Sequence, residues 1–231
     1  MEFTLLWAAV TGVGLALLMA GWEKRLGLIP AETGNLSDLM LGAAVTGLIT
    51  GRLAAMFLAG TNPLTHPGDI IIVRSGVDTG FASLGALTFV SLTSRRHLAG
   101  TIDALGPAAM AGLAGWHAGC LYRGACLGTT SSLPWAVAQE GSSVTRHPVE
   151  IYAALLFLAA SLTLLCWLRR GVPWSGAAGA AALSMAGAIR LATEPLRPSL
   201  GPGPIGWYLA AVGMGMIGVV AARFRARHGT S

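Results

Sequence analysis

Seven stretches of mostly apolar residues, joined by short polar or basic segments, dominate this sequence. A helix needs about 20 consecutive apolar residues to cross a bilayer, and the third and sixth stretches are short. Charged residues make up 11% of the chain, against roughly 25% in soluble domains, which disfavours a soluble helical bundle. The stretches predict helices over about residues 4–21, 37–59, 80–94, 101–121, 149–168, 175–192 and 205–222.

The basic residues are unevenly distributed over the segments that join these helices. Nine of the 15 Lys and Arg residues lie in alternate short segments and after the last stretch. Short basic loops face the cytoplasm, so we predict an all-α, polytopic membrane protein of about seven transmembrane helices, with its N-terminus outside and its C-terminus cytoplasmic. We expect one transmembrane domain over residues 1–231. The nine residues are Lys24, Arg25, Arg95, Arg96, Arg169, Arg170, Arg223, Arg225 and Arg227.

The net charge of +5 does not indicate a protein that binds nucleic acid. The basic residues come as short pairs between apolar runs, a pattern typical of membrane topology and not of a phosphate-binding patch. Glu2 is the only charge before the first apolar run. We therefore expect that run to be a retained helix and not a cleaved signal peptide.

The cysteines do not form the pattern of a metal site. Cys120 and Cys126 are six positions apart, and only His117 lies near them, whereas a zinc site needs more ligands at tighter spacing. We expect no metal and no cofactor. Three interpretations of the pair stay open: a disulfide on an oxidising face, reactive thiols made more acidic by His117 and Arg123, or small packing residues.

Three ionisable residues within the predicted helices are functional candidates, because a charge inside a membrane costs about 3 kcal/mol. Arg52 follows Gly51 in the middle of the second helix. A guanidinium binds phosphate through two parallel hydrogen bonds, which makes a lipid phosphate its natural partner. His117 lies in the outer half of the fourth helix, and Arg190 lies near the outer end of the sixth.

Arg190 and Glu194 are four residues apart and would share one face of a helix. Pro195 is expected to end that helix, so Arg197 can fold back over the same place. This arrangement has two interpretations: a salt bridge that stabilises the helix end, or a substrate-binding group.

The stretch "RHPVEIY" lies at the end of a long motif loop, residues 122–148, which the topology places outside the cytoplasm. Pro148 suits the first turn of the fifth helix. Helix N-termini favour anions, and Arg146 and His147 add positive charge beside Glu150 and Tyr152. The stretch predicts an anion-binding corner, with an ordinary capped helix as the alternative.

The order and spacing of these motifs resemble the prolipoprotein diacylglyceryl transferase family from about residue 40 to residue 222. The family pattern is G-R-x-G-N-F-x-N-x-E-x-x-G, then T-x-x-P-W, then R-H-P-x-Q-x-Y-E. This chain reads "WHAGCLYRGACLG", "TSSLPW" and "RHPVEIYA". The family's R-x-x-x-E-x-x-R corresponds to Arg190, Glu194 and Arg197, and the Gly-Arg of its second helix to Gly51 and Arg52. The resemblance implies seven helices in the bacterial inner membrane and a site open to the outer leaflet.

The chain also departs from the family pattern. The H-G-G-L motif, whose His is a proposed catalytic base, falls on "FASL", residues 81–84. The Arg of G-R-x-G-N falls on His117, the Asn positions on Cys120 and Arg123, and the Glu on Ala125. A Tyr expected in the first helix is absent. The chain thus resembles a divergent paralogue that keeps the lipid-binding parts and alters those proposed for thiol alkylation.

The resemblance implies a membrane transferase. It would move a diacylglyceryl or related group from an anionic phospholipid, such as phosphatidylglycerol, to the lipobox Cys of a lipoprotein precursor. Arg190 would be a catalytic cation beside the departing phosphate, and His147 or His117 would be the base. The residues expected to bind substrate are Arg52, Arg123, Arg146, Glu150, Tyr152, Glu194 and Arg197.

Two alternatives follow from the altered motifs. The acceptor could be a lipid or a small molecule, with Cys120 as a covalent relay. Otherwise the protein could bind or transport lipid without catalysis, using the same Arg residues for recognition.

Overall fold

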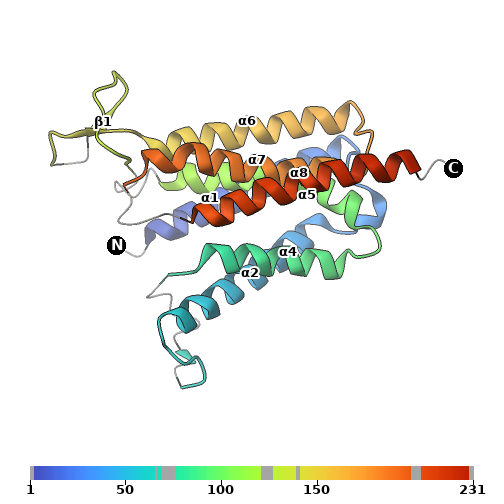
Figure 1. Cartoon of the computed structure of the whole chain (residues 1–231), viewed down its shortest axis with the longest axis horizontal. Helices are drawn as coiled ribbons and strands as arrows, with labels where there is room; N and C mark the ends of the chain where they lie inside the picture. The colour runs from blue at the N-terminus through green and yellow to red at the C-terminus, as the bar shows by residue number, and fades with distance from the viewer. Residues whose placement is uncertain are drawn as a thin grey trace. The chain divides into compact units, whose positions relative to one another are not determined.

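The computed structural model describes residues 3–65, 67–68, 76–120, 127–138, 141–198 and 204–228. The regular secondary structure of the described residues is helical apart from one short hairpin (Figure 1). The hairpin consists of β1 (Val137–Ala138) and β2 (Thr145–Arg146), and two 3-10 turns are η1 (Ala31–Thr33) and η3 (Glu194–Leu196). The α-helices are α1 (Phe3–Arg25), α2 (Leu36–Leu58), α4 (Thr79–Thr93), α5 (Leu98–Gly119), α6 (Val149–Arg169), α7 (Ala177–Thr193) and α8 (Ile205–His228).

Each of these helices falls on one of the seven apolar stretches, so the helical prediction is confirmed. Three of them, α2, α6 and α8, are long and apolar enough to cross a membrane. The ends of α1 and α8 differ from the prediction: both helices continue past the apolar run into a charged turn, to Arg25 and His228. The number of membrane crossings and the orientation stay predictions.

The chain forms two compact units. The residues up to Pro30 and those from Ala99 onward form the first, called here the five-helix unit. The second, called the α2–α4 unit, is Ala31–Leu98. The prediction of a single domain stays a prediction.

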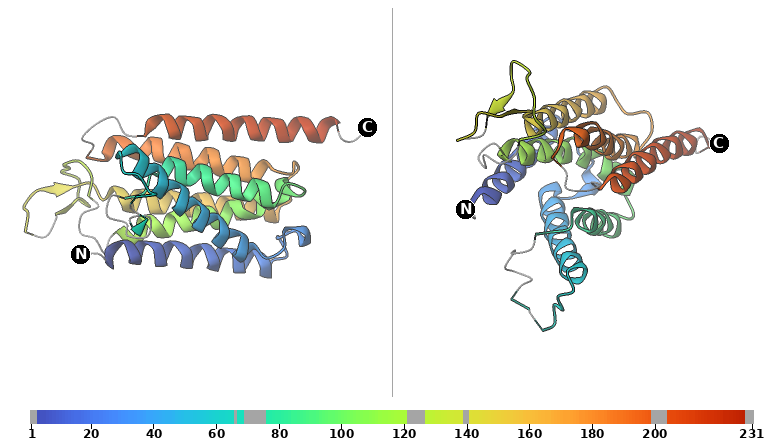
Figure 2. Two further views of the ribbon diagram at one scale, coloured as in Figure 1. Left: turned by 90° about the horizontal axis from the view of Figure 1, so that it is seen from below. Right: turned by 60° about the vertical axis from the view of Figure 1, so that its left-hand side comes forward.

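The centre of the five-helix unit is formed by apolar side chains of α5, α6 and α7. Phe157 and Leu164 of α6 are almost completely buried against Met110 of α5 and Ala178 of α7. α7 and α8 run side by side (Figure 2). These contacts fix the ends of the helices that carry the ionisable residues.

Glycine allows α1 and α5 to approach at backbone distance. A Cβ on Gly115 would lie 2.3 Å from the carbonyl oxygen of Thr11. The Thr11 hydroxyl donates a hydrogen bond of 2.8 Å to the carbonyl of Gly115. Close packing through small residues is the usual way for helices to associate in lipid, where no hydrophobic force drives them together.

One end of the five-helix unit is held by Asp103, which lies in the second turn of α5. Its Oδ2 accepts a hydrogen bond of 2.6 Å from the N–H of Gly176, and its Oδ1 accepts one of 2.9 Å from the N–H of Gly179. These N–H groups belong to the start of α7, where the helix itself has no acceptor for them. Asp103 therefore caps a neighbouring helix, and this arrangement is called the Asp103 cap below.

In the α2–α4 unit, a tight crossing brings Gly51 of α2 against the start of α4. A Cβ on Gly51 would lie 2.6 Å from the carbonyl oxygen of Asp78, and the N–H of Asp78 donates to the carbonyl of Gly51 at 3.0 Å. The side chain of Asp78 caps α4 by accepting from the N–H of Phe81 at 3.0 Å. The backbone thus places Arg52 beside this crossing.

Candidate functional site

A connected set of charged side chains lies at the other end of the five-helix unit, where α5 and α7 end and α6 and α8 begin. Side-chain contacts join these four helix ends and η3 into one row. We call the row the charge chain. Its members are His117, Glu150, Arg197, Glu194, Arg190 and Tyr208.

His117 and Glu150 form the first pair of the charge chain. Both side chains are buried, and Nδ1 of His117 is hydrogen-bonded to Oε2 of Glu150. The imidazole ring also stacks on Phe157, with 5.2 Å between ring centroids and 8° between ring planes. The ring is therefore held on one edge by a carboxylate and on one face by an aromatic ring.

Arg197 links this pair to the end of α7. Its Nη2 lies 2.8 Å from Oε1 of Glu150, and its Nε lies 3.8 Å from Oε2 of Glu194. As the sequence predicted, Arg197 folds back over the helix end after Pro195. The Nε and Nη2 groups of Arg197 are buried but not aligned for a hydrogen bond. Oε2 of Glu194 is also buried and has no aligned donor. The charges are thus close while part of their hydrogen-bonding capacity is unused.

Arg190 completes the charge chain. The predicted pair with Glu194 is present, with 3.9 Å between Nη2 and Oε2. Nη2 and Nε of Arg190 also donate to the hydroxyl of Tyr208, at 2.6 and 3.1 Å. Tyr208 was missed by the sequence analysis, because next to Trp207 it has the pattern of an interfacial aromatic anchor.

The backbone of the motif loop is hydrogen-bonded to η3, the turn that begins with Glu194 of the charge chain. The N–H of Gly128 donates to the carbonyl of His147 at 2.7 Å, and the N–H of Thr129 donates to the carbonyl of Leu196 in η3 at 2.8 Å. A Cβ on Gly128 would lie 2.2 Å from that Leu196 oxygen. Only glycine fits this contact, so Gly128 sets the position of the loop against η3.

His147 and Tyr152 lie beside the charge chain and do not belong to it. Their rings meet edge to face, with 6.2 Å between centroids, and the Tyr152 hydroxyl accepts a hydrogen bond of 2.7 Å from Nε1 of Trp135. Arg146 donates to the carbonyl of Gly128 at 3.2 Å.

The expected anion-binding corner at the start of α6 is already filled by an anion of the protein. Glu150, in the first helical turn, supplies that carboxylate, and its partners are His117 and Arg197. The assignment of Glu150 as a substrate-binding residue stays a prediction. A carboxylate paired on both oxygens is better suited to holding the side chains around it.

Arg52 and Cys120 are two further predicted residues among those that the structure describes. Arg52 lies in the α2–α4 unit, where it is buried and its Nη1 donates to the carbonyl of Gly76 at 2.9 Å. Cys120 is disulfide-bonded, so it has no free thiol in this form, and the reactive-thiol and relay hypotheses apply only to a reduced form. Arg123 and Cys126 lie outside the described residues.

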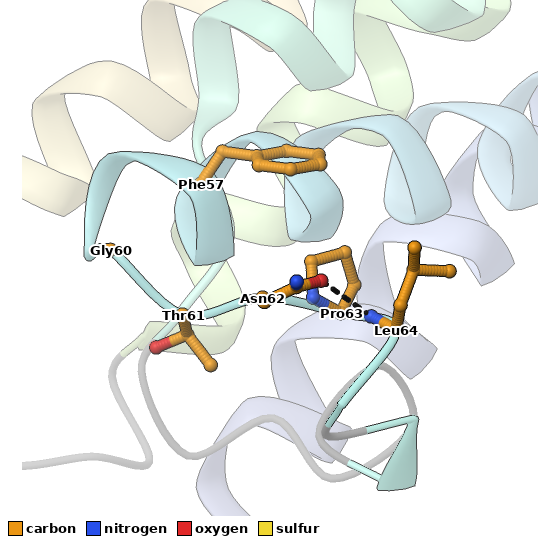
Figure 3. A pocket seen from close by; sticks show the side chains of 6 residues that line it. All are labelled: Phe57, Gly60, Thr61, Asn62, Pro63 and Leu64. Carbon is orange, nitrogen blue, oxygen red and sulfur yellow. Dashed lines mark hydrogen bonds between the residues drawn. The ribbon is translucent and has the colours of Figure 1, made fainter.

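Potential metal ligands are not clustered in the described part of the chain. Those residues contain no group of three or more His, Cys, Asp and Glu side chains that could hold a metal ion. A pocket of about 440 Å³ lies at the end of α2 in the α2–α4 unit (Figure 3). Its lining has no ionisable side chain and consists of Phe57, Gly60, Thr61, Asn62, Pro63 and Leu64.

Comparison with known proteins decides the family. The prolipoprotein diacylglyceryl transferase family matches residues 3–226, which is nearly the whole chain. The chain belongs to the prolipoprotein diacylglyceryl transferase family. It is thereby placed among membrane-associated transferases, and every residue of the charge chain lies within the matched range.

Much of this chain is similar in sequence to proteins named phosphatidylglycerol–prolipoprotein diacylglyceryl transferase. The Methylobacillus flagellatus protein is 30% identical over 76% of this chain and 66% of its own length. The Cereibacter sphaeroides protein is 30% identical over 84% of this chain and 76% of its own length. The Chlamydia trachomatis protein is 30% identical over 69% of this chain and 64% of its own length. The chain thus spans about two thirds to three quarters of these relatives.

Proposed function

We propose that this family member transfers a diacylglyceryl group from phosphatidylglycerol, or a similar anionic phospholipid, to a cysteine thiol of a lipoprotein precursor. Arg190 and Arg197 bind the phosphate that leaves, and a histidine accepts the proton of the thiol. The names of the relatives specify phosphatidylglycerol as the donor and a prolipoprotein as the acceptor. The observation that carries the proposal for this chain is the pair of half-buried guanidinium groups in one row, where Nε and Nη2 of Arg197 have no aligned hydrogen-bond acceptor.

The geometry around the two guanidinium groups supports phosphate binding. Arg190 and Arg197 approach the same oxygen of Glu194, at 3.9 and 3.8 Å, which is long for a charge-assisted hydrogen bond. A phosphate oxygen at normal hydrogen-bond distance would be a better acceptor. A cation that stabilises charge developing on a leaving group commonly contributes about 100-fold or more to a rate.

The distribution of basic residues supports an outer-leaflet location of this site in the bacterial inner membrane. In the five-helix unit, the last turns of α1, α6 and α8 carry Lys24, Arg25, Arg169, Arg225 and Arg227. Nη2 of Arg225 would lie 3.8 Å from a Cβ on Gly176, which belongs to the Asp103 cap. The basic end of α8 is thus opposite the charge chain, and the positive-inside rule assigns such an end to the cytoplasm.

The decisive test is transfer from labelled phosphatidylglycerol to a cysteine-containing precursor by the purified protein. We expect thioether product with the unchanged protein and a loss of about 100-fold or more for Arg190→Ala. Arg225→Ala is the matched control, because it removes the same group from the opposite end of the unit, and its rate should stay unchanged. Full activity of Arg190→Ala would overturn the assignment of Arg190.

A cellular test separates the proposed acceptor from the two alternatives. In cells depleted of their own transferase, growth with mature lipoprotein would support the thiol acceptor. If the cells do not grow although the protein is properly inserted, and labelled lipid is transferred to another molecule, then that molecule is the acceptor and the precursor thiol is not. Bound phospholipid without turnover on any acceptor would show a lipid-binding protein instead of an enzyme.

A further inference from the structure

We infer that His117, positioned by Glu150, is the general base of this protein, and that the charge chain combines the base and the phosphate site in a single row. The inference rests on the proposed transfer and specifies which histidine performs it. His117 is the catalytic residue in this arrangement and Glu150 is the positioning residue.

The contacts of the ring determine which nitrogen is available. Nδ1 of His117 faces Oε2 of Glu150, while Oε1 of the same carboxylate faces Arg197. A carboxylate paired with a guanidinium is an acceptor, so Nδ1 carries the proton and Nε2 carries the lone pair. Among the described residues, no hydrogen bond to Nε2 is found.

The surroundings of His117 also stabilise the ring after it has taken a proton. The charged groups in its row are the carboxylate of Glu150, in direct contact, and the guanidinium of Arg197 behind that carboxylate. The other contact of the ring is with Phe157, which carries no charge. The nearest charge to a protonated His117 is therefore negative, and a neighbouring carboxylate both orients and stabilises an imidazolium.

His147 lacks these features. Its Nδ1 is buried without a hydrogen-bond partner, and its ring meets the ring of Tyr152 edge to face. A proton placed on this ring has no carboxylate beside it in the described part of the chain. His147 is therefore better suited to holding the motif loop, through its backbone bonds to Gly128 and Thr129.

The reaction balances with these groups alone. Nε2 of His117 takes the proton of the thiol, and the sulfur forms a bond to the terminal glyceryl carbon of the diacylglyceryl group. The bond from that carbon to the phosphate oxygen breaks, and its electron pair leaves with the phosphate between Arg190 and Arg197. The imidazolium then returns its proton to water.

The test compares His117 variants over a range of pH. His117→Gln keeps a hydrogen-bond donor toward Glu150 but has no basic nitrogen, so the protein should fold while the turnover number falls about 100-fold or more. The KM for phosphatidylglycerol should stay within about twofold, because the phosphate partners are unchanged. The deficit should shrink as the pH rises past about 8.5, where the thiol ionises without a base.

Glu150→Gln tests the positioning role. It should lower the turnover number less than His117→Gln does, and its deficit should also shrink at high pH. A merely structural role would give a deficit that does not change with pH, and that result would overturn the assignment of Glu150. His228→Ala is the matched control, because His228 is exposed at the far end of α8, and its rate should equal that of the unchanged protein.

The outcomes distinguish this inference from the proposed function. If the unchanged protein makes no thioether, the proposed transfer is wrong. If it does so and folded His117→Gln is equally active at neutral pH, the transfer stands and His117 is not the base. Thermal unfolding of each purified variant in detergent establishes that it is folded.

Discussion

The two ends of the five-helix unit both bury a carboxylate, but they use it differently. At the Asp103 cap, both oxygens accept backbone N–H groups, at 2.6 and 2.9 Å. In the charge chain, the carboxylates of Glu150 and Glu194 contact side chains, and two N–H groups of Arg197 and one oxygen of Glu194 lack aligned hydrogen-bond partners. A carboxylate bonded to backbone fixes the fold, whereas a row of incompletely bonded charges is able to accept a substrate.

Among the variants that test this difference between the two ends, Arg197→Ala should lower the transfer rate most. It removes one phosphate partner and leaves Glu150 bound to His117 alone. We expect transfer to fall about 100-fold, equivalent to ~2.7 kcal/mol in the activation free energy. Activity measured per folded molecule checks this, and Arg197→Lys should restore part of it, because the charge returns without the planar fork of donors. An unchanged rate would mean that this end is no less structural than the other.

Asp103→Ala should produce the opposite pattern. Without the carboxylate, two N–H groups at the start of α7 lose their acceptor. Loss of a helix cap costs about 1–2 kcal/mol of unfolding free energy. Thermal unfolding in detergent should show the loss, while the transfer rate per folded molecule stays the same. A selective loss of rate with normal stability would contradict the structural role of the Asp103 cap.

Tyr208→Phe sharpens the comparison within the charge chain. The variant removes only the hydroxyl that accepts hydrogen bonds from Nε and Nη2 of Arg190. One such hydrogen bond contributes about 1 kcal/mol, so we expect a decrease in transfer of roughly fivefold and little change in stability. If the unfolding temperature falls and the rate does not, Tyr208 belongs to the scaffold.

Arg223→Ala should have the smallest effect. Arg223 stacks over Trp174, with 5.5 Å from its guanidinium carbon to the ring centroid. A cation–π contact at an exposed site contributes about 0.5–1 kcal/mol. We expect a slight loss in unfolding temperature and no change in transfer, measured in the same assays. A large fall in rate would connect this end to catalysis.

Sequence alone predicted the helices because their signal is local. A run of apolar residues is visible without any knowledge of its neighbours, and each run became a helix. The same is true of Arg190 and Glu194, whose four-residue spacing places them on one face. The charged last turns of α1 and α8 were missed, since a helix continues by backbone hydrogen bonding after its apolar run has ended.

The cross-helix contacts were not predictable in this way. His117 and Glu150 belong to different helices, and no period in the sequence connects them. The capping of α7 by Asp103 is equally non-local. Glu23 provides a further example: it follows the first apolar run, yet it is completely buried and neither oxygen has a hydrogen-bond partner among the described residues. Only the packing of helices decides which polar groups are enclosed.

The glycine contact between α1 and α5 affects the order in which the chain is assembled. α1 leaves the ribosome before α5, and the partner that approaches its backbone at Thr11 is made only after residues 31–98. During that interval α1 has no α5 beside it, and the face that packs on Gly115 is not covered by α5. The packing of α1 against α5 therefore takes place only after α5 has been made. A larger side chain at position 115 would hinder this packing step, and so would reduce the amount of assembled protein before it affects catalysis.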